Sequence, residues 1–246
     1  MKPELPLWQG ARLFCSTRSG GISSGSYDSL NLGDHVGDDP EKVAINRQRL
    51  ALLWGARPVF MQQVHGTALV CIDSISEEQT PQADACWSTQ SGLACTIMVA
   101  DCLPVLFHLP GARVVAAAHA GWRGLAAGVL ENTLARLATL GQVQDVQVWL
   151  GPCIGPGAFE VGKDVVHAFC ASNADAQMGF ARSQSPGKYL ADLAWLARQR
   201  LRQFGVTQIH GNDSSPAWCT YTQTATYFSH RRDGVSGRFA AGIALV

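Results

Sequence analysis

The sequence predicts a layered α/β fold, and three observations support that prediction. Short apolar runs of strand length recur along the chain, and several are apolar throughout, as in strands covered on both faces. Longer segments place apolar residues at helical spacing. We find no internal repeat and no linker that would divide the sequence, so residues 1–246 are expected to form a single domain.

The N-terminal part of the sequence predicts a strand, a long loop, a helix and then a series of strands. Residues 12–17 have the composition of a short strand, and the Gly/Ser-rich segment after them predicts a functional loop or a flexible arm. Asp39 can cap a helix that has Pro40 at its first position and ends at Gly55. Further strands are predicted at 58–61, 68–73, 94–100, 104–109 and 112–119.

The C-terminal part alternates predicted helices and strands. Residues 123–140 have apolar side chains at helical spacing, and Gly141 is a natural stop. The dipeptide Asp233-Gly234 predicts a hairpin turn between the last two strands. The other predicted elements are a strand at 146–150, helices at 162–171 and 188–204, and strands at 206–210, 224–230 and 237–245.

Composition limits the classes of partner. Lys plus Arg and Asp plus Glu each number 19, giving a formal net charge of zero, and without an extended basic block we expect neither nucleic acid nor a membrane surface as partner. The sequence shows no signal-peptide core and no apolar run of membrane-spanning length. The eight cysteines form no CxxC pair, which is typical of reduced thiols. We expect a cytoplasmic monomer that binds a small molecule.

Three potential metal donors lie where predicted strands end. Cys102 stands between two apolar runs in VADCLPVLF, and His65 precedes glycine in MQQVHGT. His119 stands in VVAAAHAGWRG, where a predicted strand gives way to glycine and a helix. Side chains at three strand ends can converge on one site. A lone buried Cys or His is more often a packing residue, so the spacing alone leaves both interpretations open.

The chemistry of these donors favours a metal. Two histidines and one thiolate suit Zn²⁺, and three protein ligands with an open fourth position are typical of a catalytic zinc site; Cu(I) is a chemically possible alternative. The same residues also permit Cys102 to act as a nucleophile with His119 as its general base and with Asp101 or another carboxylate orienting the imidazole. Only the metal site gives His65 a role.

Five further residues are candidates for substrate binding. Arg18, Asn31 and His35 lie in the Gly-rich loop, which could close over a substrate or be a solvated surface loop. Arg123 lies at a predicted helix N-terminus, where backbone amides favour anions. Arg231 belongs to the SHRRDG segment, which could bind a phosphate or carboxylate or be an exposed hairpin tip.

Seven segments, taken in order from about residue 12 to the C-terminus, resemble the YfiH-like laccase-domain family. They are TRSGGISSGSYDSLNLGDHVGDD, MQQVHGT, VADCLPVLF, HAGWRGLAAGV, GPCIGPGAFEV, KYLADLAWLARQRL and FSHRRDGVSGR. The resemblance implies metal ligands at His65, Cys102 and His119, and an α/β/β/α fold with two packed mixed sheets. Some relatives carry a further cysteine or an aromatic residue at Gly157 or Ala158, so a role for a second thiol there is not implied.

The resemblance implies several activities. Family members have been described as multicopper polyphenol oxidases, as peptidoglycan editing factors and as purine nucleoside phosphorylases with adenosine deaminase activity. A multicopper centre uses roughly ten histidines, whereas this sequence has seven. We therefore favour phosphorolysis of adenosine, inosine and methylthioadenosine, with adenosine deamination. The alternatives are polyphenol oxidation, hydrolysis of an amide in peptidoglycan precursors by Cys102, and a non-enzymatic metal- or nucleotide-sensing module.

Overall fold

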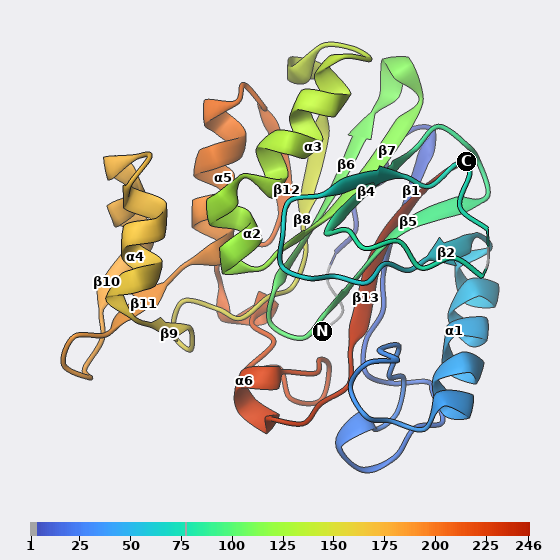
Figure 1. The fold of residues 1–246 in the computed structure, drawn as a ribbon, viewed down its shortest axis with the longest axis horizontal. Helices are drawn as coiled ribbons and strands as arrows, with labels where there is room; N and C mark the ends of the chain where they lie inside the picture. The colour runs from blue at the N-terminus through green and yellow to red at the C-terminus, as the bar shows by residue number, and fades with distance from the viewer. Residues whose placement is uncertain (1–3, 77) are drawn as a thin grey trace.

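The computed structural model describes residues 4–76 and 78–246. Two mixed β-sheets pack against each other in the centre of the molecule (Figure 1). The smaller sheet has one parallel pair and two antiparallel pairs. Its strands, in spatial order, are β1 (Ala11–Cys15), β13 (Phe239–Leu245), β5 (Leu93–Val99) and β2 (Arg57–Val59).

The larger sheet has six strands and is antiparallel at its centre. The outermost strand at each edge is parallel to its neighbour, and the inner pairs are antiparallel. In spatial order the strands are β12 (Gln208–Gly211), β8 (Gln147–Leu150), β6 (Leu103–Leu109), β7 (Val114–Ala120), β4 (Ala85–Ser88) and β3 (Leu69–Cys71). Sequence analysis missed β4.

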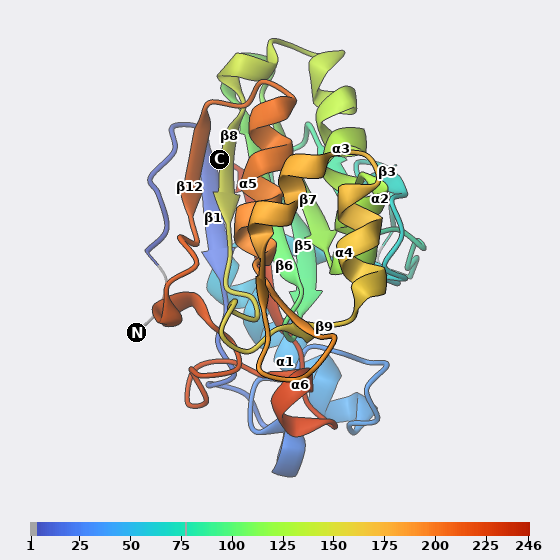
Figure 2. The same cartoon turned by 90° about the vertical axis from the view of Figure 1, so that its left-hand side faces the viewer.

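Helices cover the outer face of each sheet. On the four-stranded sheet lies α1 (Pro40–Trp54), where Trp54 stacks on Phe14 at 4.6 Å between ring centroids. The larger sheet is covered by α2 (Trp122–Ala127), α3 (Val129–Ala138), α4 (Lys163–Cys170) and α5 (Leu193–Gln203) (Figure 2). The structure thus confirms the α/β/β/α layers that the resemblance implied.

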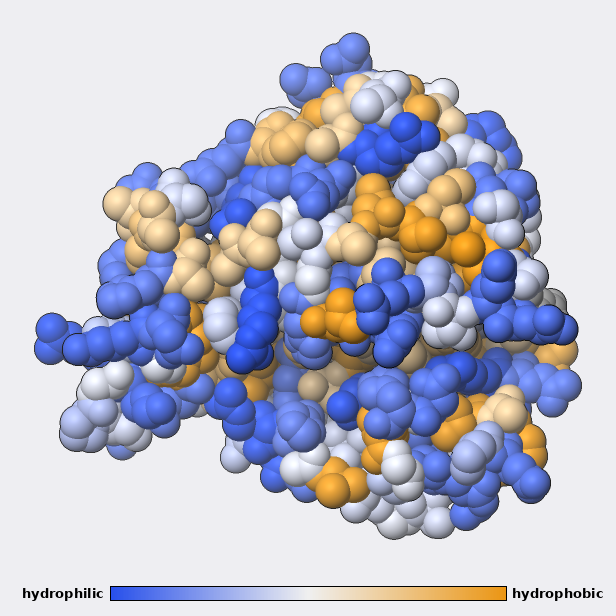
Figure 3. Space-filling view, viewed as in Figure 1, coloured by the Kyte–Doolittle hydropathy of each residue, from blue (hydrophilic) through white to orange (hydrophobic). Residues whose placement is uncertain are grey.

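The core between the sheets explains why several strands are apolar throughout. Ile97 and Ile243 from the smaller sheet and Leu106 and Val115 from the larger one are fully buried in one cluster. The outer face of each sheet is buried beneath helices, so side chains on both faces leave water. On the outside, hydrophilic residues are interspersed with hydrophobic ones over the face seen in Figure 3.

The helix predicted at 123–140 is two helices. It breaks at Gly128, whose φ of 102° lies in the left-handed region that favours glycine, and the Gly128 N–H donates to the carbonyls of Gly124 and Leu125. Apolar spacing continues across this break, so periodicity alone could not reveal it.

The helix predicted at 188–204 begins five residues late. Residues Tyr189–Ala191 form β11, which pairs in a small sheet with β9 (Glu160–Val161) and β10 (Phe180–Arg182). The helix then starts after Asp192, whose carboxylate accepts a hydrogen bond from the Trp195 N–H at 2.9 Å. The other predicted helices, at 40–54 and 162–171, are confirmed to within a residue.

The strand predicted at 224–230 and the hairpin turn predicted at Asp233-Gly234 are wrong. Tyr227 and Phe228 are buried as part of the core between the sheets, which accounts for the apolar run. The chain then forms the short helix α6 (His230–Asp233), which Gly234 ends. Among the described residues, no helix is long and apolar enough to cross a membrane.

Candidate metal and substrate site

Three potential ligands meet at one end of the larger sheet. Cys102 directly precedes β6, and His119 lies near the end of β7, where it is paired with Pro104 of β6. His65 comes from the loop between β2 and β3 and has a φ of 62°. The three ligand atoms lie within 4.8 Å of one another, and Cys102 Sγ is 3.6 Å from His65 Nε2. The antiparallel register of β6 and β7 therefore brings two of the predicted donors together.

The buried carboxylate of Asp84 holds two of these ligands in place. One oxygen lies 2.9 Å from His119 Nδ1 and accepts the backbone N–H of His65 at 2.9 Å. The other oxygen accepts the N–H groups of Gly66 at 2.7 Å and Val64 at 3.2 Å. Asp84 therefore fixes the loop carrying His65 and leaves the second nitrogen of His119 available for a ligand.

Asp84 was not among the site residues predicted from the sequence. The residue is fully buried at the start of an apolar strand. The available signal was an acidic residue inside the apolar run ADACW, because a buried carboxylate needs partners.

In the metal-free chain, the surroundings of Cys102 and His119 favour the ionised form of each side chain. Burial raises the pKa of Cys102, but the neighbouring His119 and His65 outweigh it and bring that pKa down to about 6. Burial lowers the pKa of His119, but the Cys102 thiolate and the Asp84 carboxylate outweigh it and raise that pKa to about 9. A thiolate is the form in which cysteine binds metal.

The donor set fits a tetrahedral metal ion. With the usual zinc–sulfur and zinc–nitrogen bond lengths, two tetrahedral ligands lie about 3.5 Å apart, close to the 3.6 Å between Cys102 Sγ and His65 Nε2. Gly121 lies against the cluster, and a side chain at this position would collide with it: a Cβ at Gly121 would lie 2.7 Å from the His65 ring and 3.0 Å from Cys102 Sγ. Gly121, the first glycine of HAGWRG, thus lets α2 approach the cluster.

A cavity of about 330 Å³ opens beside the three donors. Three of the predicted substrate-binding residues line it: His35 from the Gly-rich loop, Arg123 at the start of α2 and Arg231 in α6. Arg123 lies over the Trp122 ring at 4.4 Å and Arg231 over the Phe159 ring at 5.3 Å. The cavity therefore combines cations with flat apolar surfaces.

Asp101 attaches α6 to the cluster. Its side chain is buried, and its carboxylate accepts hydrogen bonds from Thr220 Oγ1 at 2.6 Å and from the backbone N–H of Arg231 at 2.7 Å. The carboxylate is therefore occupied by this attachment rather than bonded to His119. His230, which belongs to the SHRRDG segment predicted to bind an anion, also lines the cavity, whereas four other lining residues were not predicted from the sequence: Gln63, Trp122, Phe159 and Arg238.

The structure places Arg18 outside this cavity. Its guanidinium donates to the carbonyls of Asp28 at 2.8 Å and Thr224 at 3.0 Å and lies 4.8 Å from the centre of the Phe228 ring. These contacts tie the Gly-rich loop to the C-terminal part of the chain.

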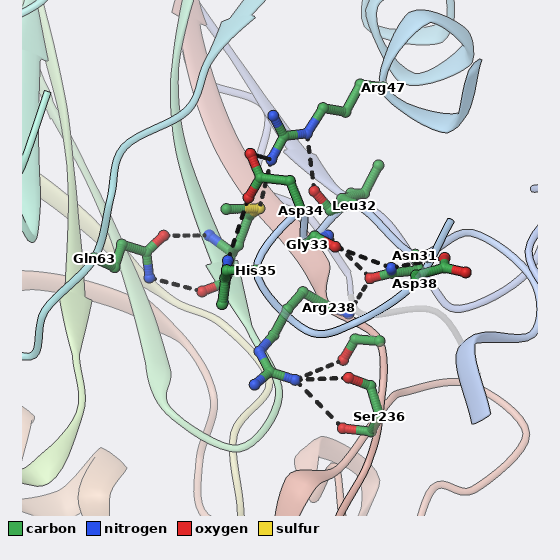
Figure 4. A network of polar contacts seen from close by, with 12 residues as sticks. Asn31, Leu32, Gly33, Asp34, His35, Asp38, Arg47, Gln63, Ser236 and Arg238 are labelled. Atoms are coloured by element: carbon green, nitrogen blue, oxygen red, sulfur yellow. Dashed lines mark hydrogen bonds and ion pairs between the residues drawn. The ribbon is translucent and has the colours of Figure 1, made fainter. Parts of the chain in front are cut away.

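Asn31 also lies behind the cavity rather than on its wall. It is fully buried, and its amide bonds Gly33, Asp38 and the backbone N–H of Arg238 (Figure 4). In the same loop, Asp34 contacts His35 at 3.3 Å and forms an ion pair with Arg47 at 3.1 Å. The loop is thus tied to α1 and to Arg238 by these contacts, and its residue His35 lines the cavity.

The family described as multi-copper polyphenol oxidoreductase laccase matches residues 12–246. The chain belongs to this laccase family. Within residues 4–76 and 78–246, His65, Cys102 and His119 are the one group of three potential metal donors. The described part of this laccase-family chain therefore offers one small centre, not the larger donor set of several coppers.

Relatives of this laccase-family chain match it along almost its whole length. The purine nucleoside phosphorylase of Pseudomonas aeruginosa is 48% identical over 245 residues, which is 100% of this chain and 98% of that protein. Purine nucleoside phosphorylase YfiH of Escherichia coli is 47% identical over 99% of this chain and 98% of its own.

Solved structures share the fold. A Neisseria meningitidis protein superposes with a TM-score of 0.91 and 42% identity, covering 100% of this chain and 98% of that one. YlmD from Geobacillus stearothermophilus superposes with a TM-score of 0.88 and 33% identity, covering 96% of this chain and 92% of its own. The α/β/β/α arrangement is therefore a property of these relatives as well.

Proposed function

We propose that residues 1–246 act as one catalytic domain, a metal-dependent purine nucleoside phosphorylase that also deaminates adenosine. The substrates would be adenosine, inosine and methylthioadenosine, with inorganic phosphate. The observation that carries the proposal is the cavity itself, in which a cluster of metal donors lies beside both cationic and aromatic side chains. The names of the near-full-length relatives give it independent support.

His65, Cys102 and His119 would hold the metal. Zinc suits this donor set, with copper as the alternative. When bound, the ion would act as a Lewis acid at neutral pH. The carboxylate of Asp84 keeps His119 in one orientation through the Nδ1 contact, so the ligand geometry is set before a metal arrives.

In phosphorolysis, a phosphate oxygen forms a bond to C1′ of the ribose while the bond between C1′ and the base nitrogen breaks. The bonding pair leaves with the purine, and the proton of hydrogen phosphate ends on the base. Arg123 and Arg231 can offset the phosphate charge, and His35 faces the same cavity. Phe159 and Trp122 offer flat surfaces on which a purine can stack.

In deamination, water adds to C6 of adenosine and ammonia leaves, giving inosine. The largely apolar wall near Ile154 and Leu193 limits the access of bulk water to the bound base.

The test is to incubate metal-loaded protein with adenosine, with and without phosphate, and to separate adenine, inosine and hypoxanthine by chromatography. We expect adenine only when phosphate is present and inosine in both cases. His65→Ala is the matched inactive control, because it removes one ligand and keeps Cys102. A wild-type protein that catalyses neither reaction would exclude the proposal.

A second candidate follows from the lowered pKa of Cys102. A thiolate beside a protonated His119 is also the arrangement of a cysteine nucleophile, which would attack an amide in a peptidoglycan precursor. The thiolate would bond to the amide carbonyl carbon as the C–N bond breaks, the amine would leave with the proton of His119, and the acyl group would stay on Cys102 until water hydrolyses the thioester. Mass spectrometry of protein quenched during incubation with a muropeptide amide distinguishes the two, because phosphorolysis leaves the thiol unmodified.

A further inference from the structure

Arg238 is a half-buried cation in the wall of the cavity. It directly precedes β13, and its backbone N–H donates to Asn31 Oδ1 at 2.8 Å. Its aliphatic stem passes so close to the loop that a Cβ at Gly33 would lie 2.8 Å from Arg238 Cγ. The Gly-rich loop therefore holds the Arg238 side chain in one position.

The hydrogen bonds of Arg238 use one of its three side-chain nitrogens. Nη1 donates to the Ser236 carbonyl at 2.9 Å, the Ser236 hydroxyl at 3.4 Å and the Gly237 carbonyl at 3.1 Å (Figure 4). Within residues 4–76 and 78–246, Nε and Nη2 have no hydrogen-bond partner, and the guanidinium forms no ion pair. Two donors of a rigid, planar group therefore remain for a ligand.

This cation is short of negative charge in the structure. Burial lowers the pKa of Arg238, and the opposing influence comes from Cys102, Asp101 and Tyr27, none of which contacts the guanidinium as an ion pair. Charges removed from water are usually paired, and Arg238 is partly removed from water. Arg123 and Arg231, by contrast, are exposed to solvent at the cavity wall, where water can satisfy them.

We propose that Arg238 binds the inorganic phosphate used in phosphorolysis. The planar guanidinium matches two phosphate oxygens through two parallel N–H donors. The position lies in the cavity that also contains Cys102 and His65, so the phosphate and the nucleoside share one space. This inference rests on the proposed phosphorylase activity and names the residue that selects its anionic co-substrate.

The experiment measures the KM for phosphate and the KM for inosine in metal-loaded wild type, Arg238→Gln and Arg238→Lys. Inosine is used because it has no amino group to lose. We expect Arg238→Gln to raise the KM for phosphate roughly 10- to 100-fold, with the KM for inosine changed less than twofold. Arg238→Lys keeps the charge but loses the two parallel N–H donors, so we expect an intermediate rise in the KM for phosphate.

Arg57→Gln is the matched control. Arg57 is also partly buried and also donates to a backbone carbonyl, that of Ile75 at 3.0 Å, but it does not line the cavity. Its KM for phosphate should equal that of wild type. Thermal unfolding midpoints, measured without phosphate and with phosphate at ten times the wild-type KM, provide a readout that needs no turnover. If Arg238→Gln does not fold, Arg238→Lys is the variant compared with wild type.

The outcomes separate the two proposals. An unchanged KM for phosphate, or a rise in the KM for inosine alone, overturns the role of Arg238. A wild type without phosphorolysis overturns the proposed function. The role of Arg238 is then decided by whether phosphate titrated over a millimolar range stabilises wild type more strongly than Arg238→Lys and Arg238→Gln least of all. The same unfolding measurement is made with adenosine 5′-monophosphate in place of phosphate. If only adenosine 5′-monophosphate stabilises wild type more than the Arg238 variants, the anion is a nucleotide phosphate and the proposal fails.

Discussion

At the scale of single residues, Asp84 contacts two of the three proposed ligands of the candidate metal centre. Its carboxylate is fully buried, yet burial does not neutralise it, because hydrogen bonds from His119 and Gly66 outweigh the desolvation and lower its pKa. An ionised carboxylate favours the His119 tautomer with hydrogen on Nδ1, so Nε2 can bind a metal.

We therefore expect Asp84→Asn to weaken zinc binding roughly 10- to 100-fold. The amide keeps the volume but presents one acceptor where the carboxylate presents two. Affinity is measured by competition with a chromophoric chelator. Asp73→Asn is the control, because Asp73 accepts hydrogen bonds from Ser88 and Thr89 away from the cluster. Equal zinc affinity in wild type and Asp84→Asn would show that the carboxylate does not position the ligand.

The cysteines should differ in reactivity when the protein is metal-free. The pKa of Cys102 is about 6, so at pH 7 most of this thiol is thiolate, and the fraction falls as the pH drops through 6. Burial raises the pKa of Cys15 to about 12 and also raises those of Cys71 and Cys170. Iodoacetamide at pH 7 should modify Cys102 first, and bound zinc should protect it. Mass spectrometry of peptides reads the order; earlier labelling of Cys71 would contradict it.

At the scale of elements, the glycine-rich junctions that carry the donors could be predicted from sequence, and the break between α2 and α3 could not. His65 directly precedes Gly66, and His119 lies two residues before Gly121 at the end of an apolar run, so each donor stands in a local pattern that the sequence displays. Asp84 bonds a histidine 35 positions away and Asn31 bonds Arg238 207 positions away. Such pairings depend on sheet topology, which explains why the sequence indicated the donors but neither Asp84 nor Arg238.

The break between α2 and α3 should be sensitive to substitution. Gly128 has a φ of 102°, and a Cβ there would be no closer than 3.6 Å to the Glu131 carboxylate, so space is available and the cost is conformational. We expect Gly128→Ala to lower the free energy of unfolding by about 1–2 kcal/mol. Urea denaturation measures it. Gly111→Ala, which has open space and no positive φ, should change stability by less than about 0.5 kcal/mol.

At the scale of the whole molecule, the candidate centre joins segments that are separate in the fold. The β2–β3 loop contributes His65, and the larger sheet contributes Cys102 and His119. Asp101 then links the cluster to α6, and Arg238 links the cavity to the smaller sheet and the Gly-rich loop. The centre therefore lies where both sheets and two long loops meet, so binding there should be coupled to global stability.

Metal binding should stabilise the folded chain by mass action. At a free zinc concentration 100 times the Kd, the free energy of unfolding should rise by about 2.7 kcal/mol, provided that the unfolded chain binds zinc weakly. His65→Ala should abolish this increase, whereas His167→Ala, at an exposed position on α4, should retain it. Denaturant unfolding of each protein with and without zinc gives the comparison. A zinc-dependent increase of the same size in His65→Ala would mean that the stabilising metal binds elsewhere, and would remove His65 from the ligand set.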